Sequence, residues 1–359
     1  MKRLLIPSIG DPEKKTMGQI FLAKDDTIPE FGPKELLVKV AYNGICGSDG
    51  HLLRGNIGPL RPVVLGLIEA MGAIPVGHEF SGVVEEVGEK AAALGFKKGD
   101  RIACNYYVGC GSCYWCRTGR ENFCQNTDNR SMAMADYIVV DSSQAYKIPD
   151  QLSLKTAAMA EPFTIAFNAV EVAKVKMGSR VAVFGGGGIG QMIAQLAKVS
   201  GAAYVAMIEP VEEKRKLALE LGADYAIDPI KEDVKKITEE ITGGLGFDCV
   251  IEASGASAAA IQALDILSID GNVVYFSMYN TEFNMPINLF TQLYQQQKHI
   301  HGMQTSAGIW PRAIAAMSRI QIDPLIQKVY TLDEYEQAFA DHFTGAYAKV
   351  MFHCNPDIE

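Results

Sequence analysis

The pattern of apolar and polar positions divides the chain into two parts. Up to about residue 160, short apolar runs separated by glycine-rich turns predict a mostly β region. Strands are predicted at Leu36–Ala41, Phe80–Val87 and Arg101–Tyr107. No helical period of useful length occurs before Leu154, although the apolar segment Leu52–Gly77 fits a short helix with loops.

From Leu154 onward the pattern predicts alternating strands and helices, and therefore a doubly wound parallel sheet of six strands. Its strands include Arg180–Phe184, Tyr204–Ile208, Tyr225–Ile227, Phe247–Glu252 and Gly271–Ser277. In one predicted helix Val234, Ile237 and Ile241 share a face, at spacings of three and four. Phe283–Leu289 alternates apolar residues with polar residues or proline, which predicts an exposed or edge strand.

The composition excludes several classes of protein. With 359 residues the chain is long enough for two domains, and 48% hydrophobic with 21% charged residues is ordinary for a globular protein. The net charge of -9 argues against nucleic acid or an anionic membrane as a partner. Too few apolar residues follow Met1-Lys2-Arg3 for a signal peptide, and the longest uncharged apolar stretch, Val181–Ala197, contains four consecutive glycines. We therefore expect a cytoplasmic protein whose eight cysteines are metal ligands or buried thiols rather than disulfides.

Four of the cysteines lie close together in one short segment. They are Cys110, Cys113, Cys116 and Cys124. Two, two and seven residues separate them, and four thiolates from one loop can close a tetrahedron around a structural zinc ion with no open position. An iron–sulfur cluster would use the same ligands, and four unrelated thiols are the less specific alternative. Cys104, Cys249 and Cys354 lie in apolar runs and are predicted to be core residues.

A second set of possible metal ligands lies between Tyr42 and Glu79. A thiol at Cys46 and an imidazole at His78 each have a neighbouring glycine, with carboxylates nearby, and thiolate with imidazole suits zinc. The glycines let the backbone turn tightly and let a substrate approach. Two ligands do not complete a tetrahedron, so a third must come from elsewhere in the chain. The alternative is a buried cysteine beside a hydrogen-bonded core histidine.

The first strand of the second part is followed by a glycine-rich turn and a helical run. Gly185, Gly187 and Gly190 fit the G-x-G-x-x-G fingerprint: the first permits the turn, the second lets backbone approach a pyrophosphate, and the third packs helix on strand. The N-terminus of the helix then offers free N–H groups to the phosphates. Glu209, nineteen residues past Gly190, ends the next strand, where an acid accepts the adenosine ribose hydroxyls. A generic α/β turn without a cofactor is the alternative.

Together these motifs resemble those of the zinc-dependent medium-chain dehydrogenases, the group that contains alcohol, sorbitol and threonine dehydrogenases. The resemblance covers nearly the whole chain. It rests on Gly44-x-Cys46-Gly-Ser48-Asp49-x-x-His51, Gly77-His78-Glu79, the four-cysteine loop, Glu161-Pro162, the glycine fingerprint and Glu209. It implies an α/β plus β fold: a GroES-like β-rich catalytic domain at 1–163 with a structural zinc lobe at about 104–128, a Rossmann NAD-binding domain at 164–303, and a C-terminal return to the catalytic domain at 304–359.

The resemblance implies a ligand set for a catalytic zinc. Cys46, His78 and Glu161 would bind it, with Glu79 as a fourth, exchangeable or water-mediated ligand. Alcohol dehydrogenases have a cysteine in place of the third ligand, whereas a glutamate there is the pattern of the polyol and threonine dehydrogenases. Asp49 would hold the second ring nitrogen of His78.

The resemblance also implies catalytic and cofactor-binding residues. Zinc would lower the pKa of the substrate hydroxyl, and the hydroxyl proton would leave through Ser48 to His51 or to water. Glu79 would be a further catalytic residue beside the zinc. A hydride would pass from the substrate carbon to the nicotinamide. Backbone groups of the segment 276–278 would hold the carboxamide. The implied cofactor-binding residues are Gly185, Gly187, Gly188, Ile189, Gly190, Glu209, Lys214, Phe276, Ser277 and Met278.

The implied reaction is hydride transfer between a secondary alcohol or a sorbitol-like polyol and NAD, with L-threonine 3-dehydrogenation as the alternative. NAD is expected over NADP because the carboxylate of Glu209 would repel a 2′-phosphate, although Lys214-Arg215 could attract one. A zinc-free quinone or enoyl reductase of this fold would lack Cys46 and the cysteine loop. The alternative of another class is a non-catalytic nucleotide-binding sensor on the same scaffold.

A homotetramer is expected, because Phe283–Leu289 would leave unpaired backbone groups at a sheet edge, and such strands pair across a dimer in this family. Two features depart from the family. Leu52–Gly77 is longer than in simple alcohol dehydrogenases, so the resemblance does not define the substrate pocket of this chain. Met132–Ala135 replaces the usual glycine pair before Asp136-Tyr137.

Overall fold

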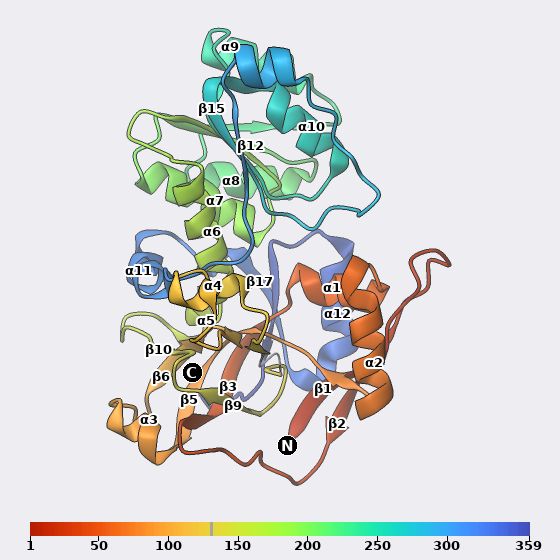
Figure 1. Cartoon of the computed structure of the whole chain (residues 1–359), viewed down its shortest axis with the longest axis vertical. Coiled ribbons are helices and arrows are strands. Elements are labelled where there is room, and N and C mark those ends of the chain that lie inside the picture. The colour runs from red at the N-terminus through yellow and green to blue at the C-terminus, as the bar shows by residue number, and fades with distance from the viewer. Residues whose placement is uncertain (130–131) are drawn as a thin grey trace.

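The computed structural model describes residues 1–129 and 132–359, without the side chains of 128 and 129. Figure 1 shows two parts along the long axis of the molecule: a β-rich part below, which holds both termini, and a parallel sheet with its helices above. The predicted fold class is confirmed, since antiparallel strands dominate the first part and an all-parallel sheet forms the second.

The β-rich part is centred on a seven-stranded sheet built from both ends of the chain. Its path runs β10-β6-β5-β3-β18-β17, and β9 pairs with β3. The strands are β3 (Glu35–Gly44), β5 (Glu79–Val87), β6 (Arg101–Cys104), β9 (Tyr137–Asp141), β10 (Ala145–Lys147), β17 (Ile326–Tyr330) and β18 (Lys349–His353). Because β18 pairs with β3, the end of the chain lies beside the strand that leads into the first motif.

Two smaller sheets accompany it. β1 (Lys2–Ser8) lies between β2 (Gln19–Lys24) and β4 (Ile74–Pro75), and β7 (Tyr107–Val108) pairs with β8 (Asp128–Asn129). Apolar side chains of β1, β3, β5, β6 and β18 form one buried cluster, which makes this part of the molecule a rigid base for the loops at its edge.

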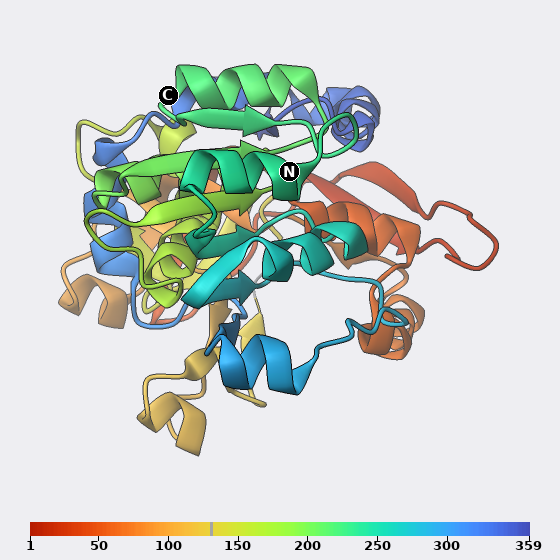
Figure 2. The ribbon, with the colours of Figure 1, turned by 90° about the horizontal axis from the view of Figure 1, so that it is seen from above.

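The upper part is a parallel sheet of six strands in the order β13-β12-β11-β14-β15-β16. The strands are β11 (Arg180–Phe184), β12 (Tyr204–Ile208), β13 (Tyr225–Ile227), β14 (Phe247–Glu252), β15 (Leu267–Tyr275) and β16 (His299–Gly302). Helices lie on both faces of the twisted sheet (Figure 2), and each face has its own apolar cluster. The order of strands reverses between β11 and β14, and ligands of such sheets bind at the carboxyl ends of the strands at that point.

Helices connect the strands and cover the sheets. The α-helices are α1 (Gly47–Arg54), α2 (Arg61–Met71), α3 (Glu89–Ala93), α4 (Tyr114–Arg117), α5 (Leu154–Ala157), α6 (Ala160–Val172), α7 (Gly188–Val199), α8 (Glu212–Glu220), α9 (Val234–Thr242), α10 (Ser257–Asp265), α11 (Trp310–Ala316) and α12 (Tyr335–Thr344). Shorter helical turns are η1 (Gly58–Leu60), η2 (Glu121–Phe123), η4 (Met317–Arg319), η5 (Asp323–Leu325) and η6 (Leu332–Glu334), and η3 (Leu289–Gln295) is a π-helix.

The predicted edge strand at Phe283–Leu289 is wrong. Residues 276–288 form no helix or strand and lead into η3, and the sixth strand of the sheet is β16. Met285 and Ile287 pack against the apolar cluster of the parallel sheet, which explains the alternation. Pro286 between them has no N–H group to donate to a ladder.

One further expectation about a strand is wrong. The run Arg101–Tyr107 is not one strand, because β6 ends at Cys104 and β7 belongs to a different sheet. The expectation of a short helix with loops in Leu52–Gly77 is confirmed, since the end of α1 and the whole of α2 lie in this segment. Val64 and Ile68, four positions apart in α2, pack on the apolar cluster of the β-rich part, whereas Val63, Leu65 and Leu67 are exposed.

Candidate metal and dinucleotide sites

Three of the expected zinc ligands converge where α1 and β5 begin. One possible ligand atom from each of Cys46, His78 and Glu79 lies within 4.8 Å of the others. β3 brings them together, since its last residue Gly44 pairs with Glu79 and the chain then turns into α1 through Cys46. A Cβ at Gly44 would lie 2.3 Å from Oε2 of Glu79, so the close approach of this carboxylate requires the glycine.

The buried Asp49 supports the cysteine of this group. Its Oδ2 accepts the N–H of Cys46 at 2.9 Å, at the N-terminus of α1. The expected hydrogen bond from the ring of His78 to the carboxylate of Asp49 is not formed among the described residues, although the charge of Asp49 is among those that raise the pKa of that ring. Asp49 therefore fixes the backbone that presents the thiol.

Glu161 lies near this group without being part of it. It is in the first turn of α6 and is 8% exposed. Burial raises the pKa of its carboxyl to about 7, with His78 and Lys349 acting in the opposite direction. The charges that act on the pKa of Glu161 are therefore those of the converging side chains and their neighbours. Its carboxylate is not, however, among the possible ligand atoms that lie within 4.8 Å of one another in the described chain.

The charges at this site favour a cation. Burial lowers the pKa of His78, but Cys46, Asp49 and Glu161 together raise it well above its usual value. Glu79 is buried and forms an ion pair with Nζ of Lys349, which offsets the effect of burial and lowers the pKa of the carboxyl. The thiolate of Cys46, the imidazole of His78 and the carboxylate of Glu79 form a donor set that suits zinc.

α1 carries the two residues expected to move the proton. Ser48 and His51 are three positions apart on this helix, so their side chains share a face. Nδ1 of His51 is buried and has no hydrogen-bond partner in the part of the chain that the structure describes. Burial, and then Arg54, lowers the pKa of this imidazole, so it is neutral near pH 7 and can accept a proton.

The turn between β11 and α7 has room for a phosphate group. Gly185 has φ +96°, which favours glycine, and a Cβ at Gly190 would lie 1.8 Å from the carbonyl oxygen of Gly185. At Gly187, in contrast, no atom lies within 4 Å of a Cβ position. The first and third glycines are therefore required by the fold, whereas the second leaves open space beside the backbone.

The first turn of α7 also contacts the end of the chain. Gly188 and Ile189 begin this helix, and the N–H of Gly188 donates to the carbonyl oxygen of Ala348 at 3.0 Å. Ala348 directly precedes Lys349, the partner of Glu79. The two residues at the start of β18, Ala348 just before it and Lys349 as its first residue, thus connect the glycine turn with the converging ligands.

Glu209 closes the glycine turn from the end of β12. It is 5% exposed, and its two oxygens accept the N–H groups of Gly186 at 2.5 Å and Val211 at 2.9 Å. Arg215 donates to the carbonyl oxygen of Glu209 at 2.6 Å and forms an ion pair of 3.1 Å with Asp228. Arg215 is therefore already engaged, and the attraction for a phosphate expected of Lys214-Arg215 is reduced to Lys214. Burial lowers the pKa of that lysine.

The segment expected to hold a carboxamide follows β15 at the carboxyl edge of the sheet. Phe276, Ser277 and Met278 extend from the strand, and Oγ of Ser277 donates to the carbonyl oxygen of Glu252 at 3.2 Å. The segment is therefore held next to the end of β14, at the reversal of strand order.

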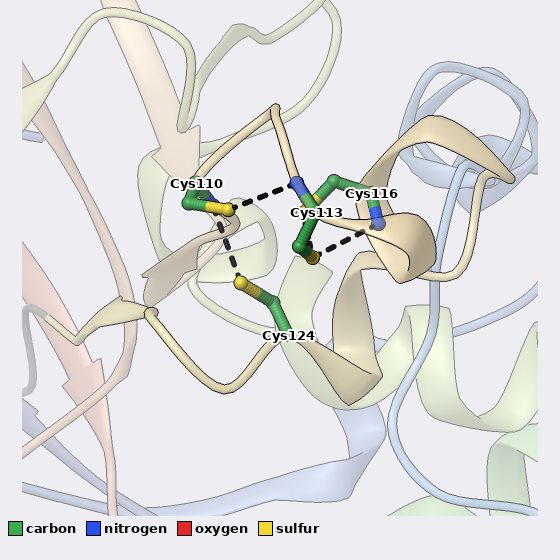
Figure 3. A group of neighbouring side chains, drawn as sticks. All are labelled: Cys110, Cys113, Cys116 and Cys124. Carbon is green, nitrogen blue, oxygen red and sulfur yellow. Dashed lines mark hydrogen bonds between the residues drawn. The ribbon is translucent and has the colours of Figure 1, made fainter.

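The four cysteines of the lobe converge on one point (Figure 3). The sulfur atoms of Cys110, Cys113, Cys116 and Cys124 lie within 4.8 Å of one another. Backbone N–H groups donate to these sulfurs, among them that of Cys113 to Cys110 at 3.4 Å and that of Cys116 to Cys113 at 3.5 Å. Such bonds favour the thiolate form, and all eight cysteines of the chain are free. The lobe offers four sulfur donors and no open position, which fits a structural zinc site.

Two family models match the chain. The model of the alcohol dehydrogenase GroES-like domain matches residues 32–150, and the model of zinc-binding dehydrogenases matches residues 188–319. A D-arabitol-phosphate dehydrogenase from Enterococcus avium is 34% identical over 93% of this chain and 94% of its own length. The chain belongs to the zinc-dependent medium-chain dehydrogenase family.

Other members of the family are similarly related. A sorbitol dehydrogenase from Halalkalibacterium halodurans is 30% identical over 92% of this chain and 95% of its own. An L-threonine 3-dehydrogenase from Chromobacterium violaceum is 31% identical over 91% and 94%. Alcohol and polyol dehydrogenases of the zinc-dependent type are thus the class of enzyme, and the individual substrate differs among these relatives.

Solved structures agree with the fold of this dehydrogenase. One described as a zinc-binding dehydrogenase from Clostridium scindens is 41% identical, with a TM-score of 0.93 over 99% of both chains. A zinc-binding dehydrogenase from Sinorhizobium meliloti, bound to NADP, is 29% identical with a TM-score of 0.83 over 99% of both. An alcohol dehydrogenase from Escherichia coli, complexed with NADH, is 26% identical with a TM-score of 0.82 over 99% of both.

Zinc and a nicotinamide dinucleotide are accordingly the cofactors of this dehydrogenase, and the residues present fit both. The four-cysteine lobe and the cysteine–histidine–glutamate group supply zinc donors, and the open space at Gly187 can receive a phosphate. None of the helices in the described residues has the length and apolar character needed to cross a membrane.

The sequence did not point to three residues near the site. Lys349 pairs with Glu79. The ring of Tyr106 lies 5.0 Å from that of His78, and His342 of α12 packs against α1. All three come from other segments than the motifs they contact, so no local spacing could have found them.

Proposed function

We propose that this dehydrogenase oxidises a secondary hydroxyl group of a polyol and uses NAD as hydride acceptor. The observation that carries the proposal is the convergence of Cys46, His78 and Glu79, with a glutamate rather than a cysteine, Glu161, beside them. A glutamate in that place is the pattern of the polyol and threonine branches of the family. Two of the relatives are named for polyol substrates, an arabitol phosphate and sorbitol.

In this proposal Cys46, His78 and Glu161 would hold the catalytic zinc, with Glu79 as an exchangeable ligand. When bound, zinc lowers the pKa of the substrate hydroxyl and the nicotinamide accepts the hydride. Ser48 accepts the hydroxyl proton and passes its own toward the neutral imidazole of His51. The ion pair of Glu79 with a buried lysine keeps this carboxylate charged within the site.

The structural zinc would be held by the lobe and the dinucleotide by the glycine turn. Glu209 would accept hydrogen bonds from both ribose hydroxyls, because each carboxylate oxygen retains a lone pair beyond its backbone bond. Related structures hold either NADP or NADH, so the choice of NAD rests on Glu209 and on the engagement of Arg215 with Asp228.

The surroundings of the site favour a polyol over threonine. An amino acid substrate needs a cation for its carboxylate. Lys349 is already paired with Glu79, and the guanidinium of Arg54 lies over the ring of Phe343, 4.6 Å from its centre. His51 and His342 have lowered pKa values and are neutral near pH 7. A polyol needs only uncharged hydrogen-bond partners, which the hydroxyls of Ser48 and Tyr106 can provide.

The test is a substrate panel with purified enzyme: sorbitol and other polyols, arabitol phosphate, simple secondary alcohols and L-threonine, each with NAD and NADP. We expect the highest kcat/KM for a polyol with NAD. A preference for L-threonine would assign the enzyme to the other branch, and nucleotide binding without turnover of any substrate would favour a sensor.

We further propose the domain boundaries 1–163, 164–303 and 304–359, a homotetrameric assembly and a cytoplasmic location. The boundaries are supported by the distribution of the sheets, since the residues of the parallel sheet all lie between 180 and 302. The location is supported by the eight free cysteines, which suit a reducing compartment.

A further inference from the structure

The segment between β16 and α11 contacts both metal-binding regions of the enzyme. It comprises residues 303–308, which we call the strap. The strap begins where the N–H of Met303 donates to the carbonyl oxygen of Tyr275 at 3.1 Å, at the end of β15. It contains no helix or strand, so its conformation depends on the contacts along its length.

One set of contacts joins the strap to the four-cysteine lobe. Nδ2 of Asn122 donates to the carbonyl oxygen of Gln304 at 3.1 Å. The N–H of Gly308 donates to Oε1 of Glu121 at 3.0 Å. Glu121 and Asn122 both lie in η2, which ends directly before Cys124, the last of the four cysteines. The strap is therefore bound at two points to the segment that presents this cysteine.

A second set of contacts joins the strap to α6, the helix of Glu161. Nδ2 of Asn168 donates to the carbonyl oxygen of Thr305 at 3.0 Å. The hydroxyls of Ser306 and Thr164 are 2.7 Å apart, and Oγ1 of Thr164 donates to the carbonyl oxygen of Glu161 at 2.7 Å. Because Thr164 has one hydroxyl proton, Ser306 must be the donor between the two. A buried chain of hydroxyls thus runs from the strap to the backbone of Glu161.

The strap holds an unfavourable backbone conformation between these two sets of contacts. Thr305 has φ +53°, a left-handed conformation that is an outlier for a β-branched residue. Its buried hydroxyl lies near the buried hydroxyl of Tyr107: burial raises the pKa of the tyrosine to about 12, and Thr305 acts in the opposite direction. Backbone strain of this kind persists only where the surroundings impose it, and it is found at functional sites.

We propose that the strap positions Glu161, so that the folded four-cysteine lobe is needed for the geometry of the catalytic metal site as well as for stability. Asn122 and Ser306 are positioning residues in this proposal, since they act through the strap and through α6. The inference rests on the proposed role of Glu161 as a ligand of the catalytic zinc.

The test compares Asn122→Ala and Ser306→Ala with matched controls that touch neither contact. Asn126→Ala changes an exposed asparagine of the same lobe, whose side chain makes no hydrogen bond in the described structure, and Ser143→Ala changes an exposed serine. Each variant is loaded with Co²⁺, and metal content, Co²⁺ affinity at the catalytic site and the visible spectrum are measured, together with kcat and KM.

We expect both positioning variants to retain the metal of the lobe and the melting temperature of the controls. Their Co²⁺ affinity at the catalytic site should fall about tenfold, with a shifted spectrum and a similar loss in kcat, because partners that orient a ligand typically contribute that much. Asn122→Gln, which keeps the amide donor, should recover part of the loss. Spectra and affinities equal to those of the controls would overturn the proposal.

Failure of the strap proposal can be separated from failure of the ligand assignment by Glu161→Ala. Its control is Glu220→Ala, an exposed glutamate of α8. If Glu161→Ala keeps the catalytic metal and its spectrum, Glu161 is not a ligand and both proposals fail. If it loses them while Asn122→Ala and Ser306→Ala do not, only the strap proposal is wrong.

Discussion

At Glu209, the proposed recognition of a ribose would depend on a carboxylate that already accepts two backbone hydrogen bonds. Both oxygens accept backbone N–H groups, one from the glycine turn itself at Gly186. These bonds hold the carboxylate at the place where an adenosine ribose would lie, and they leave lone pairs for its hydroxyls. A 2′-phosphate would meet the same fixed negative charge at close range, which costs several kcal/mol in a partly desolvated cleft.

Replacing Glu209 by serine should narrow the preference for NAD. Because the substitution removes a repulsion of several kcal/mol, we expect the ratio of kcat/KM values for NAD and NADP to fall by about a hundredfold. Arg215 remains paired with Asp228 and so adds no attraction for the phosphate. Adding Asp228→Asn should narrow it further by releasing the arginine. Glu213→Ser, an exposed acid on α8, is the control and should leave the ratio unchanged. A wild-type enzyme that uses NADP as efficiently as NAD would contradict this account of Glu209.

Residues whose partners are close in sequence could be predicted, and residues whose partners are remote could not. The four lobe cysteines lie within fifteen positions, and their spacing alone identified the site that the structure assembles. Lys349 stands 270 positions from Glu79, in a strand whose side chains otherwise look like ordinary core. Only the pairing of β18 with β3 brings the lysine to the carboxylate.

At the scale of elements, the packing of α1 against α12 determines the surroundings of His342 and therefore its pKa. A Cβ at Gly50 of α1 would lie 3.3 Å from Nε2 of His342, so the glycine makes room for this ring. The groups that act on it are Lys349 from β18, Glu79 from β5, and Arg54 and His51 from α1. Burial has the largest effect and, with Lys349, Arg54 and His51, lowers the pKa of His342 to about 4, whereas Glu79 acts in the opposite direction.

His342 should make the enzyme sensitive to mild acid. Its folded-state pKa lies below the unfolded value of about 6.5, so the unfolded chain binds the proton more readily and stability falls as the pH drops from about 6.5 to about 4. The contribution is up to about 3 kcal/mol. His342→Gln should lose less free energy of unfolding over this range than wild type, measured by denaturant titration. His299→Gln, an exposed histidine, should follow wild type, and parallel curves for His342→Gln would show that the ring is not the cause.

Element assignments were reliable where apolar periodicity and burial coincide. The strands of the parallel sheet are buried on both faces and were found, apart from β16, whose two histidines give it no apolar signal. The segment Phe283–Leu289 alternates because Met285 and Ile287 pack on the parallel sheet, although the segment joins none of the sheets that the described residues form. A short helix was expected in the segment that contains α2, but its bounds were not, because Val64 and Ile68 pack on the core while Val63, Leu65 and Leu67 between and beside them are exposed.

At the scale of the whole molecule, the end of the chain connects the two halves. β18 completes the sheet of the β-rich part, its Lys349 reaches Glu79, and the preceding Ala348 accepts the N–H of Gly188 in the glycine turn. The residue that contacts the glycine turn and the residue that contacts the converging ligands are therefore neighbours in the chain. This contact gives the two halves a defined relation at the point where hydride transfer needs it.

The molecule should hold two zinc ions with separate roles. The lobe offers a closed set of four sulfurs, whereas the second site gathers Cys46, His78 and Glu79, and the proposed ligand set of Cys46, His78 and Glu161 would keep a position for substrate. Mild chelation should remove the second ion first and abolish turnover before the melting temperature changes. Elemental analysis during the chelator titration, run beside thermal unfolding, checks this order. One zinc per chain, or an iron chromophore from the lobe, is the result that would refute it.

The last prediction concerns assembly. The expected homotetramer was argued from a strand at Phe283–Leu289 that does not exist, yet the parallel sheet still has an open edge at β16. Beside that edge, η3 exposes Leu289, Phe290 and Tyr294, which are 68%, 61% and 75% exposed. An open strand edge next to exposed apolar side chains is a surface that another chain would cover. A closed dimer through this surface, paired again, would give the tetramer.

Light scattering at micromolar concentration should therefore find a tetramer for the wild type and smaller species for Phe290→Asp/Tyr294→Asp. Two buried aspartates at such a contact would cost more than the apolar area they replace contributes. Met177→Asp, at a residue 90% exposed and remote from η3 in sequence, is the control and should remain tetrameric. A tetramer that survives the double substitution would place the contact elsewhere, and a monodisperse wild-type monomer would end the assembly prediction altogether.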